Sequence, residues 1–318
     1  MKLFFLSFFM MATALYAQDK DLFQIDVTGR IQGWDQGSTA TAPAEQNLKG
    51  VLRVDGWVNV TPDGCLRVAS RLATGDKFNN EWVNTGIGDS EASMNLALRQ
   101  LYISSSCLKN ITVDVGAAPV RRHGTLGLSE SGYVDGINIV IDEEGAGRNW
   151  IISVGAVGGE PNLFKRDYDE INHASVQVKQ EITKEHAAFV AVAKYKETMF
   201  TRGGISWALS KYSKWLKETG AEVLFADEHM LGGIVYAKFA VKNWTNTFSI
   251  AKITPDVNSD EKAGFLMKQF YGYGTNVYFE ANRKVNDRMN LDFRVRLGDA
   301  GTRVQAGFTL KFGVRKRR

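Results

Sequence analysis

Two kinds of side chain in this sequence could do chemistry: arginines at alternating positions, and a few histidines near hydroxyl or carboxyl groups. Guanidinium groups recognise anions through charge and paired hydrogen bonds, so a row of them on one face would select solutes by charge. A histidine close to a serine would instead suggest nucleophilic hydrolysis. Which chemistry the chain can perform depends on the elements that position these residues.

The histidines give little support to catalysis. Only His173-Ala174-Ser175 places a histidine beside a serine, as a membrane phospholipase would require, but Val176-Gln177-Val178 follows instead of a glycine-rich segment. Asp227 and His229 are the nearest candidates for a protease pair at a barrel rim. Histidines and cysteines are too few and too scattered for a tetrahedral metal site. We therefore predict no catalytic residue, no metal and no cofactor, and keep a barrel hydrolase as the alternative.

The N-terminus has the order of a secretory signal. Lys2 precedes an uncharged apolar stretch, residues 3–15, and Ala17 precedes a polar segment. This order predicts a signal peptide over 1–17, with Ala12-Thr13-Ala14 as another cleavage context. The stretch is too short for a membrane anchor, because a spanning helix needs about 20 apolar residues.

The charge balance does not support a nucleic-acid role. The chain has 39 basic and 35 acidic residues, and the net charge of +4 is matched by the four basic residues of 315–318. The remainder is close to neutral and carries no basic face. We therefore treat 315–318 as a basic periplasmic tail.

Alternation of apolar and polar residues recurs along the whole chain after the signal. Near the C-terminus, apolar residues occupy alternate positions over 291–297 and again over 304–312. Segments of about ten alternating residues are typical of membrane-crossing strands, and no later stretch resembles a spanning helix. The fold class is therefore an all-β, antiparallel transmembrane barrel over 18–314, in one domain.

The pattern predicts sixteen strands, with fourteen or eighteen as alternatives. They are expected at 22–34, 48–60, 65–75, 92–104, 110–118, 132–141, 148–157, 171–181, 186–196, 204–216, 220–228, 233–242, 245–254, 268–281, 287–298 and 302–313. Short turns, including 61–64 and Lys217-Glu218-Thr219, alternate with longer loops at 35–47, 76–91, 119–131, 158–170 and 255–267. Short periplasmic turns and long external loops are typical of outer-membrane barrels. Trp57, Trp150, Trp215 and Trp244 fall at the periplasmic ends, where an aromatic girdle is expected.

The last strand resembles the C-terminal assembly signal of outer-membrane barrels. Gln305, Gly307, Leu310 and Phe312 match its spacing, although Gly313 and the basic tail follow the final aromatic residue. Segments 98–103 and 134–137 are also similar to strands of Gram-negative porins. The resemblance implies an outer-membrane channel for small hydrophilic solutes, inserted by the barrel-assembly machinery among outer-membrane lipids, and it leaves a homotrimer open. A structural or adhesive barrel is a further alternative, for which loop 76–91 offers Phe78, Trp82 and Ile87.

Polar faces of the strands would line the lumen. The expected pore-lining residues are Arg53, Arg67, Arg71, Arg99, Arg121, Arg122, Asp135, Arg294 and Arg296. Arg99 joins this set only if a bulge lies beside it, because Leu98 and Leu101 are out of phase. A sixteen-stranded lumen is wide enough to conduct, and its arginines would give a weak preference for anions. The alternative is that the arginines pair with Asp55, Asp135 or other wall carboxylates.

The third external loop departs from the porin pattern. Porins carry acidic residues on this loop, opposite a basic wall, whereas 119–131 holds Arg121, Arg122 and His123, with Glu130 as its one acid. The loop is also short for a constriction. An acidic constriction is therefore not expected.

Two cysteines in an exported chain predict one disulfide. Cys65 opens the third strand and Cys107 follows the fourth, so both should lie at the periplasmic rim of neighbouring antiparallel strands. The spacing of such strands suits a bridge. Two free thiols remain the alternative.

Overall fold

The structure is a computed structural model that describes residues 22–37, 44–126 (without 77, 79, 90 and 94), 132–166, 170–226, 229–254 and 274–316. Within these ranges the chain is almost entirely β-strand, with two single 3₁₀ turns at Glu144–Ala146 and Leu163–Lys165. The strands are β1 (Phe23–Gln36), β2 (Glu45–Asn59), β3 (Leu66–Thr74), β4 (Val83–Gly88), β5 (Leu96–Leu108), β6 (Ile111–Pro119), β7 (Tyr133–Glu143), β8 (Arg148–Ala156), β9 (His173–Glu181), β10 (His186–Tyr195), β11 (Thr198–Ala208), β12 (Leu216–Ala226), β13 (His229–Val241), β14 (Trp244–Ile253), β15 (Gly274–Lys284), β16 (Met289–Gly298) and β17 (Arg303–Lys316).

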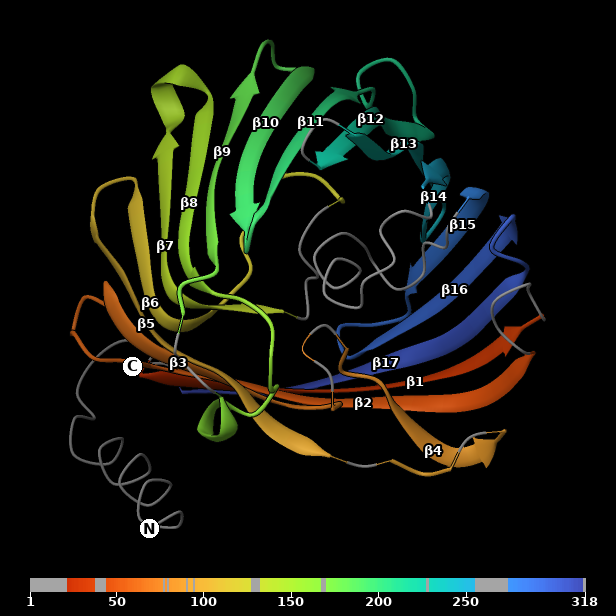
Figure 1. The fold of residues 1–318 in the computed structure, drawn as a ribbon, viewed down its shortest axis with the longest axis horizontal. Helices are drawn as coiled ribbons and strands as arrows, with labels where there is room; N and C mark the ends of the chain where they lie inside the picture. Colours follow the sequence, from red (N-terminus) through yellow and green to blue (C-terminus); the bar gives the residue numbers. More distant parts are fainter. Residues whose placement is uncertain are drawn as a thin grey trace.

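Sixteen of these strands form a closed antiparallel barrel, as the sequence predicts. Each pairs with its neighbours in chain order, and β1 pairs with β17 to close the wall (Figure 1). β4 is not part of the wall: it pairs only with β2, over Asn47–Gly50, beyond the point where β3 stops pairing. It lies within the segment expected to be loop 76–91.

The two ends of the barrel differ in their connections. We call the turn end the rim with connections 60–65, 109–110, 144–147, 182–185, 209–215, 242–243 and 285–288, where β1 begins and β17 ends. The loop end carries the longer connections 75–82, 120–132 and 157–172, among others. These three long connections match predicted long loops, whereas 196–197 and 299–302 at the same end are short.

Alternation along the strands separates an outer apolar face from an inner polar face. On β1, Ile25 and Ile31 are exposed on the outside of the barrel. Arg30 and Gln32, on either side of Ile31, point inward and donate hydrogen bonds inside the barrel. Val190, Val235 and Phe248 are exposed outward in the same way on later strands. Backbone groups are satisfied between strands, and the pairing of β1 with β17 closes the sixteen-strand wall, as a barrel in lipid requires.

One predicted strand was misplaced. The sequence predicts a strand over 204–216 and a turn at Lys217-Glu218-Thr219, but β11 ends at Ala208, and those three residues lie in β12. The connecting turn is 209–215. Tyr212 and Trp215 are of residue types common in strands, so the sequence resembles a strand here although the backbone forms a turn.

The tryptophans divide into two groups. Trp150 of β8 and Trp244 of β14 face outward and lie close to the turn end of the barrel. Trp215 lies in the 209–215 turn. Trp57 is opposite Gln24 and Ala69 on the inner face, so its expected place in an outer girdle is wrong. Trp207, at the end of β11 and 46% exposed, was missed because β11 was misplaced.

Some predictions fall outside the described residues. These are the signal peptide over 1–17, Glu130, Asp227 and loop 255–267. Of the tail, Arg315 and Lys316 extend β17 by pairing with Gln24 and Phe23. Within the described ranges, no helix has both the length and the apolar character needed to cross a membrane.

Candidate functional site: the barrel interior

The interior has two unlike sides. Inward positions of β16, β17, β1, β2, β3 and β5 carry charged and amide side chains, and we call this surface the charged wall. Near the loop end, inward positions of β7 and β10–β15 are apolar instead. They pack with Leu126 and Val157 from two loops, and Phe78 and Val120 lie against them.

The apolar side is a packed core and cannot be a wet pore wall. Its buried members include Tyr195, Phe200, Leu224, Ile234 and Tyr278, each less than 10% exposed. Burying a side chain of this size is worth about 1.5–3 kcal/mol relative to exposing it to water. Inward apolar residues of a barrel therefore need a cover, and loop residues supply part of it here.

An ion pair crosses the barrel seam on the charged wall. Asp292 of β16 accepts hydrogen bonds from Arg30 (2.8 Å) and from Gln32 (2.6 Å), both on β1, with β17 between them. The residue opposite both Gln32 and Asp292 on β17 is Gly307. A Cβ at Gly307 would lie 2.3 Å from the Ile31 carbonyl oxygen, so glycine permits this close approach.

A cation–aromatic cluster lies further toward the loop end. Lys49 of β2 and Arg303 of β17 lie 4.0 and 3.9 Å from the ring centroid of Trp34. The indole N–H of Trp34 donates to Gln32 (2.8 Å), and its ring meets that of Trp82 edge-on at 5.6 Å. The rings hold these cations in place on the wall, since cations are attracted to indole faces.

The acid that faces the predicted arginines comes from the second loop. Glu81, which is 3% exposed, accepts hydrogen bonds from Arg53 and lies 3.9 Å from Arg71. Arg71 also donates to Asp55 at 2.6 Å. Arg53 and Arg71 are thus largely compensated, and no sequence pattern predicts Glu81 as their partner.

Compared with Arg53 and Arg71, Arg67 is less compensated and Arg121 is more exposed. Arg67 lies 5.8 Å from the ring centroid of Trp57, and among the described residues no carboxylate lies within ion-pair distance of it. Arg121 bonds Asp114 at 2.9 Å, but its own side chain is 40% exposed whereas that of Asp114 is 1% exposed. These two cations therefore present more charge to the interior than Arg53 and Arg71 do.

The expected bulge is present at Arg99. Arg71 is opposite Gln100 and Leu72 is opposite Leu98, so Arg99 is the extra residue. Its side chain is fully buried and donates to the Phe78 and Asn80 carbonyls (3.1 and 2.6 Å). Arg99 therefore fastens the second loop and does not face open solvent.

The other predicted pore-lining residues contact loops or neighbouring strands. Asp135 is held by Arg166 of the 157–172 loop at 2.8 Å and is buried beneath it. Arg294 lies 3.8 Å from Glu280, and Arg296 donates to the Ala300 carbonyl (2.9 Å). Arg122 lines a small interior cavity with His173 and Arg202.

The third loop folds inward despite its short length. Glu222 of β12 accepts the backbone N–H groups of Thr125 and Leu126 at 2.8 and 3.0 Å. Arg202 of β11 donates to the carbonyls of His123 (3.1 Å) and Leu126. We call these contacts the loop latch. Arg202 was missed as a functional residue because it lies outside the predicted strands. Glu222 lies within the predicted strand 220–228, but its contact with the distant third loop leaves no local signal.

His123 is held in a position that opposes protonation. Burial lowers the pKa of its imidazole from 6.5 to about 4, and the positive charges of Lys179 and Arg202 act in the same direction. Its backbone N–H donates to the Gln177 side chain at 3.0 Å. The third loop is therefore packed with a neutral histidine.

The interior does not present the hydrolase arrangement. His173 and Ser175 are buried on the inner face of β9, whereas a phospholipase pair would have to face the exterior. Asp227 and the His229 side chain lie outside the described part. No group of three or more potential metal ligands occurs among the described residues.

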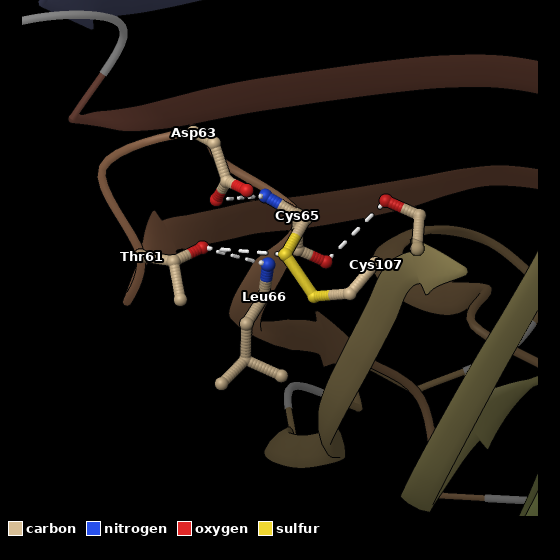
Figure 2. Close-up of a disulfide and its surroundings, with 6 residues drawn as sticks. Thr61, Asp63, Cys65, Leu66 and Cys107 are labelled. Atoms are coloured by element: carbon tan, nitrogen blue, oxygen red, sulfur yellow. Dashed lines mark hydrogen bonds between the residues drawn. A yellow bond between two sulfur atoms is a disulfide. The ribbon is translucent and has the colours of Figure 1, made fainter. Parts of the chain in front are cut away.

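Cys65 and Cys107 are joined by a disulfide at the turn end, with Cα atoms 4.7 Å apart (Figure 2). The Cys65 N–H donates to Asp63 (3.1 Å), and the Thr61 hydroxyl donates to the Cys65 sulfur. The Ser106 N–H donates to the Cys65 carbonyl at 2.7 Å. The bridge thus joins the start of β3 to the end of β5, across the strand pair that contains the Arg99 bulge.

Comparison with known proteins places the fold. No protein-family model matches the sequence, and no curated protein sequence matches it significantly. Among solved structures, a mutant of the Rhodopseudomonas blastica porin superposes with a TM-score of 0.61 at 12% identity, covering 92% of this chain and 100% of the porin. A triple mutant of that porin gives the same values, and a structure described under asymmetric conductivity of engineered proteins covers 91% of this chain with a TM-score of 0.61.

These similarities define the class of fold. The chain is a porin-like β-barrel of sixteen strands, with porin architecture over most of its length.

Proposed function

We propose that the protein is a channel of a Gram-negative outer membrane through which small hydrophilic solutes diffuse. The observation that carries this proposal is the charged wall, which lies inside a closed barrel whose outer face is apolar. Part-exposed charges inside such a barrel require water, because burying an isolated charge in an apolar medium is prohibitively unfavourable. Lipid outside and water inside are the surroundings that the two faces fit.

The solute path is eccentric. The packed apolar side occupies the loop-end half of β10–β15, so passage follows the charged wall, where Arg30 and Arg53 remain 22% and 31% exposed. Arg121 of the third loop, 40% exposed, also faces this path. Solutes on this path meet cations and amides rather than apolar surface. The path is narrower than the sixteen strands alone would allow.

Uptake by vesicles tests the channel directly. Purified barrel in liposomes should admit small neutral sugars and exclude large ones, as a narrow aqueous path requires. Sugar entry is followed as liposome swelling. If liposomes that contain folded protein swell no faster than protein-free liposomes, the channel proposal is rejected. Lipid hydrolysis by the same vesicles would favour the hydrolase alternative instead.

The channel prefers anions weakly in this proposal. Arg67 lacks a described carboxylate partner and Arg121 stays exposed, whereas most other wall arginines are compensated. Replacing Arg67 and Arg71 together by Ser should reduce the reversal potential measured across a salt gradient. Arg148→Ser with Arg283→Ser, on outward strand positions, is the matched control and should change nothing. A clear cation preference of the unmodified protein would overturn this part.

The last strand, β17, is the segment that we propose the barrel-assembly machinery recognises. Gln305 and Gly307 face inward on β17, whereas Phe312 is 53% exposed on the outer face. This two-faced pattern supports recognition by the barrel-assembly machinery during insertion. Substituting Phe312 by Asp should lower the yield of inserted barrel in cells. Chemical cross-linking of the membrane-inserted barrel tests the homotrimer.

A further inference from the structure

We propose that the 209–215 turn is a binding site for anionic phospholipid headgroups at the turn end of the barrel. The inference rests on the proposed membrane location, and it adds a lipid preference that a porin-like fold does not itself imply. It is carried by the shape, exposure and charge of this one connection.

The turn is a fixed structure. The backbone N–H groups of Tyr212 and Ser213 both donate to the Leu209 carbonyl at 2.9 Å. The Ser213 hydroxyl accepts from the N–H groups of Trp215 (3.2 Å) and Leu216 (2.9 Å). The Ala240 N–H of β13 donates to the Trp215 carbonyl at 2.7 Å, which fastens the turn to the neighbouring strand. Its side chains are therefore presented in a defined arrangement.

Two large aromatic side chains of this turn are uncovered. Tyr212 is 70% exposed and Trp215 is 64% exposed. Aromatic side chains of this size stabilise a protein chiefly by burying their surface, so exposing two together calls for a partner. The outer face of β11 continues the apolar surface through Ile205 and Trp207, which are 53% and 46% exposed. The aromatic pair thus lies at the border of the surface that faces lipid.

Lysines surround the aromatic pair. Lys211 and Lys214 lie in the turn and are exposed, and Lys217 follows at the start of β12, so a lysine recurs at every third position. Glu185 lies 3.5 Å from Lys211, which is itself 70% exposed, and Glu218 is already bonded to Tyr236 and Lys238. The turn therefore keeps an excess of positive charge next to its aromatic side chains.

This combination fits an anionic phospholipid better than a zwitterionic one. Tyr and Trp favour the level of the headgroups, where the ring is apolar and the polar tip stays hydrated. A lysine there can extend its stem along the apolar surface and place its ammonium group at a phosphate. Anionic headgroups attract such lysines, and each lysine adds to the attraction.

Quenching of tryptophan by brominated lipid tests the site. The full-length mature barrel is inserted into phosphatidylcholine vesicles that contain phosphatidylglycerol, with bromine on one lipid or the other at equal mole fraction. The difference between the unmodified protein and Trp215→Phe isolates the Trp215 signal. We expect quenching of Trp215 by brominated phosphatidylglycerol to exceed that by brominated phosphatidylcholine by about twofold or more.

Neutralising the turn should remove this preference. The triple variant Lys211→Gln, Lys214→Gln, Lys217→Gln should equalise quenching by the two lipids. A matched triple variant at exposed positions of the loop end, Lys194→Gln, Lys196→Gln, Lys252→Gln, should retain the preference. Raised salt should weaken the preference of the unmodified protein, because the attraction is screened.

The outcomes separate the two proposals. Equal quenching of Trp215 by both lipids in the unmodified protein, or a preference that survives the turn substitutions, would overturn the lipid site and leave the channel intact. If neither lipid quenches any tryptophan of the folded barrel, the membrane location fails, and the lipid site fails with it.

Discussion

At the scale of single residues, the interior charges depend on partners that lie far away in the sequence. Arg53 and Arg71 alternate with apolar residues, so their inward direction is predictable from the strand pattern. Their compensation by Glu81 is not, because Glu81 comes from a connection whose path no periodicity describes. The arginine row was thus predicted, and the degree to which it is neutralised was not.

Removing the Glu81 charge should increase anion preference. Glu81→Gln leaves Arg53 and Arg71 with one acid fewer, so the reversal potential in a salt gradient should shift further toward anions. Glu91→Gln, an exposed residue of the same connection, is the control and should cause a much smaller shift. A shift toward cations in the Glu81 variant would contradict the assigned role.

Acid should loosen the third loop through His123. Burial lowers the pKa of His123 to about 4, whereas the imidazole of a released loop would titrate near 6.5. Between these two pH values the released loop binds a proton that the packed loop does not, so packing weakens as pH falls from 6.5 toward 4. The protection factors of 120–126, which compare each exchange rate with the intrinsic amide rate at the same pH, should therefore fall over this range, by at most about tenfold per pH unit.

The same measurement on His123→Gln separates this effect from general acid loosening. The variant should lose most of the change between pH 6.5 and 4. An unchanged pH profile in the variant would show that another group controls the loop.

At the scale of elements, the sequence predicts most strands because one face meets lipid and the other does not. Fifteen of the predicted ranges overlap their strand over most of its length, and the bulge beside Arg99 follows from two apolar runs out of phase. The failure at 204–216 has the same physical origin. Tyr212 and Trp215 are large aromatic residues of an exposed turn, and a pattern of apolarity cannot distinguish such a turn from a strand.

The third loop shows the limit of arguing from length. Its shortness argued against a constricting role, yet Glu222 and Arg202 hold its residues 123–126 inside the barrel. These partners are 76 to 97 residues away in sequence. Local sequence therefore carries no signal of the contact.

The loop latch can be released at Glu222. Glu222→Ala removes the acceptor of the Thr125 and Leu126 N–H groups, and hydrogen bonds to a charged group are worth about 1.5–3 kcal/mol each. Trypsin should then cut after Arg121 or Arg122 roughly ten- to a hundredfold faster in the folded barrel. Glu218→Ala, on the same strand, contacts Tyr236 and Lys238 and should not change this rate. Equal cleavage rates in the unmodified protein and Glu222→Ala would argue against the latch.

The barrel seam depends on Gly307. In Gly307→Ala the new Cβ would meet the Ile31 carbonyl at 2.3 Å, so β17 and β1 must separate locally. We expect destabilisation of about 1–3 kcal/mol, measured as a lower urea midpoint of barrel unfolding. Gly29→Ala at the same seam has no atom within 4 Å of the new Cβ and is the control. A Gly307 variant as stable as the Gly29 variant would show that the seam has room.

At the scale of the whole molecule, the barrel combines two designs. The loop-end half of β10–β15 has a packed apolar interior, as in a filled barrel, whereas β16, β17 and β1–β3 keep a charged inner face, as in a wet one. The strand count predicts width, and the inward side chains decide how much of that width is open. We therefore expect a channel with a path along one wall.

Single-channel recording from purified, folded protein in a planar lipid bilayer distinguishes an open path along one wall from a closed barrel. We expect discrete conductance steps that rise with KCl concentration, and a reversal potential that indicates a weak anion preference in a salt gradient. The conductance should be below that expected for an unobstructed sixteen-stranded lumen. A bilayer that stays silent, although the inserted protein is shown by heat-dependent gel mobility to be a folded barrel, would contradict the account.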